Sequence, residues 1–149
     1  MKTLVVYDSV HGNTEKIAQA IGEAVGGEVE VLHAGAADPS ELKTVDLLFV
    51  GAPTHGGRAS PGMQGFLKKL EGSTLEGIDV AAFDTRLTAR WVRIFGYAAG
   101  RIGSTLEKMG GTLVASPEGF FVKGTEGPLK EGELERAARW AQEIVKSKE

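Results

Sequence analysis

The chain contains no cysteine, which excludes disulfide bonds, thiolate metal sites and thiol redox chemistry. Its three histidines are scattered without the spacing of a metal-binding motif, so we expect no metal site. Neither sign of charge dominates: the formal net charge of -3 argues against binding to nucleic acid. No apolar run is long enough for a signal peptide or a membrane span. We therefore expect a cytoplasmic protein without a membrane span.

What the sequence does contain is an alternation of apolar, β-branched runs with amphipathic helical patterns. The runs lie at residues 3–7, 29–32, 47–50, 80–83 and 113–122. The helical patterns lie near residues 17–25, 63–70, 95–109 and 134–145, with a short helix predicted from Asp38. Strands that alternate with helices in right-handed crossovers form a parallel sheet covered on both faces. The sequence therefore predicts one α/β domain over residues 1–149, with a doubly wound, three-layer α/β/α sandwich.

The loop after the first predicted strand is suited to hold a phosphate group without a positively charged side chain. It combines hydroxyl and glycine residues and leads directly into a helix, whose N-terminal N–H groups and dipole attract anions. The absence of Lys and Arg favours a phosphate monoester that stays bound, and argues against phosphoryl transfer. A plain strand-to-helix turn with a side-chain cap is the structural alternative. Asp8 is expected to point away from the phosphate and to pair elsewhere. The candidate residues are Ser9, Val10, His11, Gly12, Asn13 and Thr14.

In doubly wound sheets, ligands bind beyond the carboxyl ends of the strands, where the strand order reverses. Three predicted loops meet there, at residues 9–14, 53–58 and 84–91. We therefore expect these loops to enclose one site.

These loops resemble those of the flavodoxins, in their short-chain form, over essentially the whole chain. The family binds FMN in a loop of the pattern (Ser/Thr)-x-(Ser/Thr)-Gly-x-Thr, which Ser9, Gly12 and Thr14 match. His11 replaces the middle hydroxyl, and Val10 stands where the family often has Thr. The resemblance implies FMN as cofactor and a five-stranded parallel sheet in the order 2-1-3-4-5.

The second loop, residues 51–57, matches the flavodoxin pattern of a Gly-x-(Pro/Ser)-Thr turn followed by an aromatic residue and a glycine. His55 stands where the family has the aromatic that stacks on the inner face of the flavin. The resemblance implies that the next peptide flips on reduction and stabilises a neutral semiquinone, and Gly56-Gly57 supplies the backbone freedom for this. The candidate residues here are Pro53, Thr54, His55, Gly56 and Gly57.

The third loop would enclose the pyrimidine end of the flavin, with backbone groups near Asp84, Thr85 and Arg86. Trp91 is the candidate for the outer stacking residue, and Tyr97 is the alternative. A packing role for Trp91 beneath a long loop remains open.

From Thr85 to Leu106 the chain has no acidic residue but several arginines. Flavodoxins that shuttle electrons usually present an acidic rim, so this segment differs from the family. It is either a solvated helix start, or a docking patch for an acidic protein or a charged nucleotide. The residues expected at such a docking patch are Arg86, Arg90, Trp91 and Arg93.

The resemblance implies an electron-transfer protein that cycles through oxidised, semiquinone and hydroquinone flavin, with reductase and acceptor proteins as partners. An FMN-dependent oxidoreductase of the same fold is the alternative, of the NAD(P)H:quinone reductase or porphyrinogen oxidase type. A flavin-free interaction domain is the second alternative. A phosphorylated receiver is excluded, because the third strand ends in Val50-Gly51-Ala52 without the required Asp.

Overall fold

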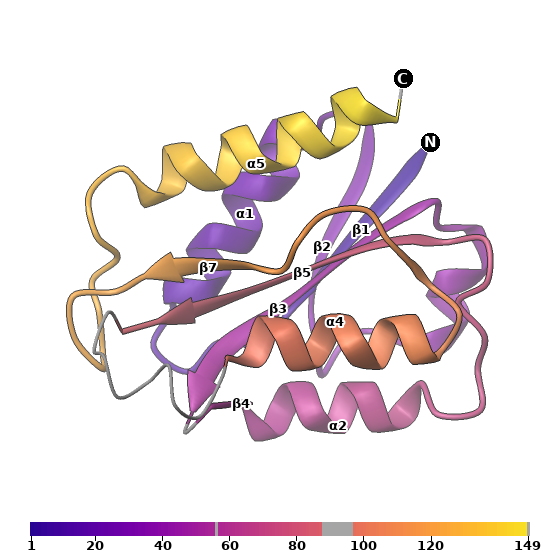
Figure 1. The fold of residues 1–149 in the computed structure, drawn as a ribbon, viewed down its shortest axis with the longest axis horizontal. Helices are drawn as coiled ribbons and strands as arrows, with labels where there is room; N and C mark the ends of the chain where they lie inside the picture. The colour runs from indigo at the N-terminus through magenta and orange to yellow at the C-terminus, as the bar shows by residue number, and fades with distance from the viewer. Residues whose placement is uncertain (56, 88–96, 149) are drawn as a thin grey trace.

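The computed structural model describes residues 1–55, 57–87 and 97–148, in which strands and helices alternate (Figure 1). The strands are β1 (Lys2–Tyr7), β2 (Glu28–His33), β3 (Leu47–His55), β4 (Arg58–Ala59), β5 (Asp79–Arg86), β6 (Thr112–Leu113) and β7 (Glu118–Phe121). The helices are α1 (Asn13–Val25), the 3-10 helix η1 (Pro39–Thr44), α2 (Pro61–Lys69), α4 (Ala98–Lys108) and α5 (Glu133–Ser147).

The sheet follows the order β2-β1-β3-β5-β6, with β7 also pairing with β5, and these pairings are parallel. This confirms the predicted α/β class and the order of the main strands. The predicted number of five strands is wrong, because the described residues form seven. The apolar run 113–122 is divided into β6 and β7 by a segment containing Pro117, which has no N–H for a sheet hydrogen bond. The short β4, which pairs antiparallel with β3, was not predicted.

Two hydrophobic cores lie on opposite faces of the sheet. Helices α1 and α5 cover one face, and α2 and α4 cover the other (Figure 1). Alternate residues of β3 enter the two cores: Leu48 and Val50 lie in one, Leu47 and Phe49 in the other. This is why the middle strands read as continuous apolar runs rather than as alternating patterns. Trp140 of α5 packs against one of these cores, since its ring contacts those of Phe49, Phe83 and Phe120.

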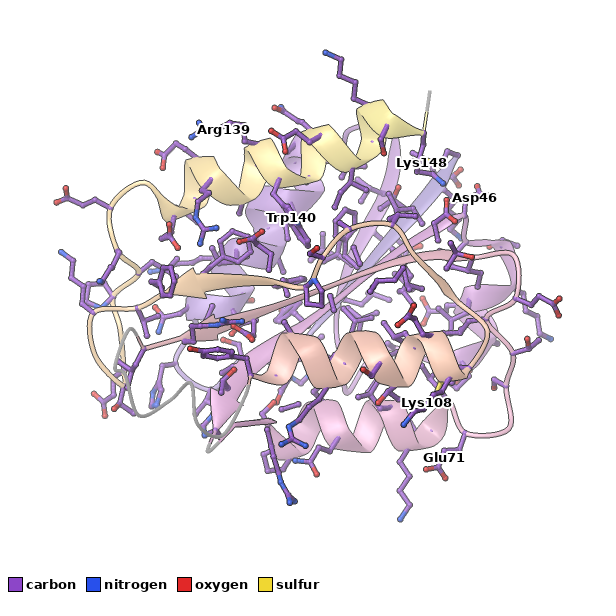
Figure 2. The ribbon with its side chains drawn as sticks, viewed as in Figure 1. Asp46, Glu71, Lys108, Arg139, Trp140 and Lys148 are labelled. Atoms are coloured by element: carbon purple, nitrogen blue, oxygen red, sulfur yellow. The ribbon has the colours of Figure 1, made fainter. Side chains whose placement is uncertain are left out.

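Lys2 and Lys148, near the two ends of the described chain, lie at the edge of the sheet where the parallel strands begin (Figure 1). The Lys2 amide donates to Asp46 at 2.8 Å, just before β3, and the Lys148 ammonium pairs with Asp79 at the start of β5 (Figure 2). The carboxyl ends of the strands therefore lie at the opposite edge. In the described part of the chain, no helix has both the length and the apolar character that crossing a membrane requires.

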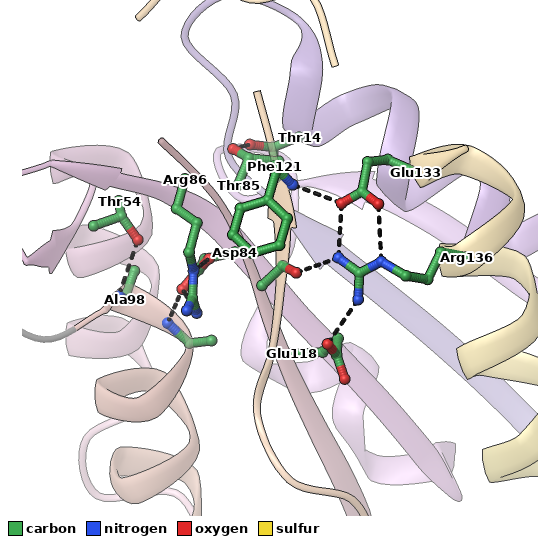
Figure 3. Close-up of polar contacts among 12 residues, drawn as sticks. Thr14, Thr54, Asp84, Thr85, Arg86, Ala98, Glu118, Phe121, Glu133 and Arg136 are labelled. Atoms are coloured by element: carbon green, nitrogen blue, oxygen red, sulfur yellow. Dashed lines mark hydrogen bonds and ion pairs between the residues drawn. The ribbon is translucent and has the colours of Figure 1, made fainter. Parts of the chain in front are cut away.

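A charged network joins α5 to β7. The Arg136 guanidinium donates to both carboxylate oxygens of Glu133, at 2.9 and 2.7 Å, and to Glu118 at 2.8 Å (Figure 3). The Phe121 amide also donates to Glu133, at 2.7 Å. Burial pushes the pKa of Glu133 upward, but the hydrogen bonds from Arg136 and Phe121 and the nearby positive charges outweigh it, so the pKa lies below its ordinary value.

Replacing Glu133 by Gln should therefore destabilise the fold in a pH-dependent manner. A carboxylate whose pKa is lowered by folding stabilises the protein above its unfolded-state pKa, and this stabilisation disappears as the pH falls through the lower folded-state pKa. We expect the variant to be less stable by about 1.5–3 kcal/mol at pH 7, the range for hydrogen bonds to charged groups. Urea titrations of both proteins from pH 7 to pH 3 check this. A stability difference that does not shrink with acidification would contradict it.

Candidate cofactor site

A cleft lies at the carboxyl ends of β1, β3 and β5, where the three predicted loops converge. Most of the residues singled out from the sequence line it. They are Ser9, Val10, His11, Asn13, Thr14, Pro53, Thr54, His55, Thr85 and Arg86. Gly12 and Gly57 belong to the same loops, and Asp84 lies fully buried at the end of β5. Gly56, Arg90, Trp91 and Arg93 lie outside the described residues.

The first loop forms a tight turn that opens α1 toward this cleft. The Gly12 amide donates to the Ser9 hydroxyl at 2.9 Å, and Gly12 has a φ of 88°, a conformation that favours glycine. A Cβ at Gly12 would meet nothing within 4 Å, so the space beside the loop is open. Within the part of the chain that the structure describes, no side chain caps the N-terminus of α1. The structural alternative of a capped turn is therefore not observed.

The side chains at the start of α1 are used for contacts to other loops. The Thr14 hydroxyl lies 2.8 Å from that of Thr85, and the two share a buried hydrogen bond (Figure 3). The Asn13 amide donates to the Glu126 carbonyl at 3.2 Å. These contacts fix the helix start, and among the described residues no side chain accepts from the N–H groups of Asn13 and Thr14, an arrangement that fits a bound phosphate.

Asp8 is turned away from the phosphate loop, as expected. Its carboxylate accepts from His33 Nε2 at 3.0 Å and from the Ser60 hydroxyl. The Gly35 amide donates to His33 Nδ1 at 3.0 Å, which assigns the ring proton to Nε2. The carboxylate nearest to the loop in sequence is thus hydrogen-bonded to His33 and Ser60, neither of which lines the cleft.

The hydroxyl of the neighbouring Tyr7 donates a hydrogen bond to the Glu15 carboxylate, in the first turn of α1, at 2.9 Å. Burial and this hydrogen bond raise the pKa of Tyr7 above its ordinary value.

Asp84 and Arg86 form an enclosed ion pair at the end of β5. The guanidinium donates to both carboxylate oxygens at 2.7 and 2.8 Å, and the Ala99 amide adds a third bond to Asp84 at 2.9 Å (Figure 3). The Tyr97 ring stacks on the guanidinium, with Cζ 3.4 Å from the ring centre. On another side, the guanidinium lies close to the backbone of Gly119, where an added Cβ would come within 2.2 Å of Arg86 Cζ. Only glycine therefore leaves room for Arg86 at this position.

This enclosure corrects two expectations. Only 14% of the Arg86 side chain is exposed and its charge is paired, so it does not present a free charge to a docking partner. Tyr97, the alternative stacking residue, contacts Arg86 instead and is not among the residues that line the cleft.

Three lining residues were not named as candidates from the sequence: Leu87, which lies within the predicted loop 84–91, Val122 and Thr125. Leu87 directly follows a candidate residue, and Val122 follows β7, which ends at the same edge of the sheet as β5. The rule that ligands lie beyond the carboxyl ends of strands could therefore have indicated both. Thr125 is held beside the cleft by the hydrogen bond from the Asn13 amide to the carbonyl of the next residue, Glu126. No sequence pattern predicts this contact.

Comparisons with known proteins agree with this geometry. Residues 4–93 match the family model described as a flavodoxin domain. Flavodoxin 1 of Escherichia coli is 32% identical over 129 residues, covering 84% of this chain and 73% of that protein. A flavodoxin of Aquifex aeolicus is 35% identical over 82 residues, covering 52% of this chain and 44% of that protein. Among solved structures, oxidised flavodoxin 2 from Bacillus cereus superposes with a TM-score of 0.85 at 27% identity, covering 100% of both chains. An archaeal flavodoxin does so with a TM-score of 0.82 at 26% identity, over 99% of this chain and 98% of that chain. The fold, the cleft and these similarities agree that the chain belongs to the flavodoxin family of FMN-binding electron-transfer proteins.

Proposed function

We propose that the protein is an electron carrier that holds FMN in the cleft described above and passes single electrons between partner proteins. When bound, FMN supplies the redox chemistry, and the protein supplies binding, orientation and electrostatics. The observation that carries this proposal is the uncapped N-terminus of α1 at the cleft, in a loop without Lys or Arg. Such an end binds a phosphate through backbone N–H groups and the helix dipole.

The remaining lining residues have separate roles in this proposal. The Ser9 hydroxyl accepts from Gly12, and its own proton can be donated to a phosphate oxygen. Pro53, Thr54 and His55 bound one side of the ring site, and Thr85, Arg86 and Leu87 bound the other. His55 is the aromatic side chain that the described part of the cleft offers for stacking.

Titration of the apoprotein with FMN and with riboflavin, followed by flavin fluorescence, tests the phosphate site. We expect FMN to bind about a hundredfold more tightly than riboflavin, equivalent to ~2.7 kcal/mol, because only FMN carries the phosphate. Equal binding of the two flavins would refute the phosphate site. Binding of neither would refute the cofactor and favour a flavin-free interaction domain.

Measuring steady-state turnover distinguishes an electron carrier from an enzyme. A carrier should show negligible steady-state oxidation of NAD(P)H with quinones when it is the only protein present. Turnover with saturation by both substrates would instead identify an oxidoreductase of the same fold. The cytoplasmic location expected from the sequence stays a prediction.

The partner proteins are proposed to dock at the arginine-rich residues that follow β5 in the sequence, with Arg90, Trp91 and Arg93 among them. The exposed Arg58, which pairs with the cleft residue His55, supports positive charge near this site. We expect the rate of electron exchange with an acidic donor to fall with ionic strength, because attraction between opposite charges is screened by salt. A rate that rises with ionic strength would indicate a basic partner.

A further inference from the structure

The chain that leaves β7 folds back on itself as a short hairpin over residues 121–130. Val122 and Leu129 form an antiparallel bridge within it. The Gly127 amide donates to the Gly124 carbonyl at 2.9 Å and closes the turn. The two residues between these glycines therefore form the tip of the hairpin.

The hairpin is held at both of its ends by contacts to other elements. At its base, the Phe121 amide donates to the Glu133 carboxylate of α5 at 2.7 Å (Figure 3). At its tip, the Glu126 carbonyl accepts from the side chain of Asn13, which is only 8% exposed. The Gly127 backbone packs against the same side chain, since an added Cβ there would lie 2.6 Å from Asn13 Oδ1. The tip is thus fixed against the start of α1.

Thr125, at this tip, differs from the other threonines that line the cleft. Thr14 and Thr85 share one hydrogen bond, and the Thr54 hydroxyl accepts from the Ala98 amide. The Thr125 hydroxyl makes no hydrogen bond to any residue that the structure describes. It is therefore the threonine hydroxyl of the cleft whose donor and acceptor capacities are both open to a ligand.

The loop at residues 9–14 supplies few side-chain donors for the phosphate that it is proposed to hold. Val10 and His11 carry no hydroxyl, and the hydroxyl of Thr14 is engaged by Thr85. A phosphate monoester presents three strong acceptor oxygens. A donor from another element beside the loop would therefore add a contact that the loop itself does not provide.

We propose that Thr125 is a phosphate-binding residue: its hydroxyl donates to an oxygen of a phosphate monoester held at the start of α1. Asn13 is the positioning residue that keeps the hairpin tip beside this phosphate. The inference rests on the proposed function and adds a fourth segment of the chain to the cofactor site. Hydrogen bonds to charged acceptors are roughly twice as strong as neutral ones. Because the tip is already held, little conformational entropy is lost when the bond forms.

Two substitutions at Thr125 isolate the hydroxyl from the shape of the side chain. Thr125→Val removes the hydroxyl and keeps a β-branched side chain, and Thr125→Ser keeps the hydroxyl without the methyl group. Thr112→Val is the matched control. It makes the same exchange at an exposed residue of β6, which pairs with the start of β5 at the edge of the sheet opposite to the cleft.

The test titrates the apoproteins with FMN and with riboflavin and follows flavin fluorescence. We expect Thr125→Val to bind FMN about tenfold more weakly, as for the loss of one hydrogen bond to a charged group. Its affinity for riboflavin should change by less than about twofold, since riboflavin has no phosphate. Thr125→Ser should keep most of the FMN affinity, and Thr112→Val should change neither affinity.

A double-mutant cycle with Asn13→Ala tests the positioning role. Without the Asn13 side chain the tip is no longer held, so adding Thr125→Val should weaken FMN binding by only about twofold in this background. Riboflavin binding should show no such coupling. FMN losses that multiply independently would overturn the positioning role of Asn13.

Three results would overturn the role of Thr125. They are wild-type FMN affinity in Thr125→Val, equal losses of FMN and riboflavin in that variant, and an equally large FMN loss in Thr125→Ser. In each case a wild-type protein that prefers FMN to riboflavin leaves the proposed function standing. If the wild-type protein binds both flavins equally, or neither, the phosphate site fails and this inference fails with it.

Discussion

Replacing Asp84 by Ala is expected to lower the free energy of unfolding by about 3–5 kcal/mol, the cost of removing one partner from a buried ion pair. Asp84 is fully buried and accepts three hydrogen bonds, two from Arg86 and one from the Ala99 amide. Its removal leaves a guanidinium under the Tyr97 ring without a counter-ion and an N–H of α4 without an acceptor. Urea denaturation should show a lower midpoint, with a slope that stays close to the wild-type value.

Two comparisons identify the ion pair as the cause of this loss. Glu107→Ala removes an exposed carboxylate from α4 and should change the stability by less than about 0.5 kcal/mol. Combining Asp84→Leu with Arg86→Met replaces both charges with apolar groups, which is often close to neutral, so this double variant should recover most of the loss. A cost below about 1 kcal/mol for Asp84→Ala would show that water or a rearranged loop compensates for the missing carboxylate.

Replacing Ser9 by Asp should weaken FMN binding at least about a hundredfold, or ~2.7 kcal/mol, while changing riboflavin binding much less. The introduced carboxylate would share the phosphate loop with the phosphate, and two charges 4 Å apart near a protein surface interact by about 4 kcal/mol. The loop has no Lys or Arg to offset this repulsion. The same carboxylate should stabilise the apoprotein by about 0.3–1 kcal/mol, because it lies at the positive end of the α1 dipole.

Opposite effects on apoprotein stability and on FMN affinity are the specific signature of this prediction. Both can be measured on one sample, by thermal unfolding of the apoprotein and by flavin titration. Ser9→Ala is the control: it removes the acceptor for the Gly12 amide without adding charge, and should weaken FMN binding by only about tenfold. Equal losses of FMN and riboflavin in Ser9→Asp would mean that the loop is distorted rather than filled by a competing anion.

The fold was predictable because its strongest signals are local. Continuous apolar runs such as residues 47–50 occur where both faces of a strand are covered, and the structure buries Leu47, Leu48, Phe49 and Val50 completely. The loop at Ser9 was predictable for a similar reason, since the strand, turn and helix that form it are consecutive in the chain. The interruption between β6 and β7 was missed because the apolar residues continue on both sides of Pro117.

The environment of Arg86 could not be predicted in this way. Counting charges along residues 85–106 indicated a basic rim, but the partner of Arg86 lies two residues earlier, on the same side of β5. The groups that enclose it are uncharged: Tyr97 lies within the same segment, and Gly119 comes from β7. Charge patterns describe which groups are present, whereas burial and pairing decide which of them face a partner.

The placement of Lys2 and Lys148 at the edge of the sheet opposite to the cleft has a practical consequence for handling the protein (Figure 1). A tag or a linker attached before Lys2 or after Lys148 starts beside the beginnings of the strands, so a fused domain need not cover the cofactor entrance. On an electrode, attachment through either end would turn the entrance toward the solution. Such a film should exchange electrons readily with dissolved proteins and slowly with the metal beneath it, whereas anchoring through the outer face of α4 would bring the entrance closer to the surface.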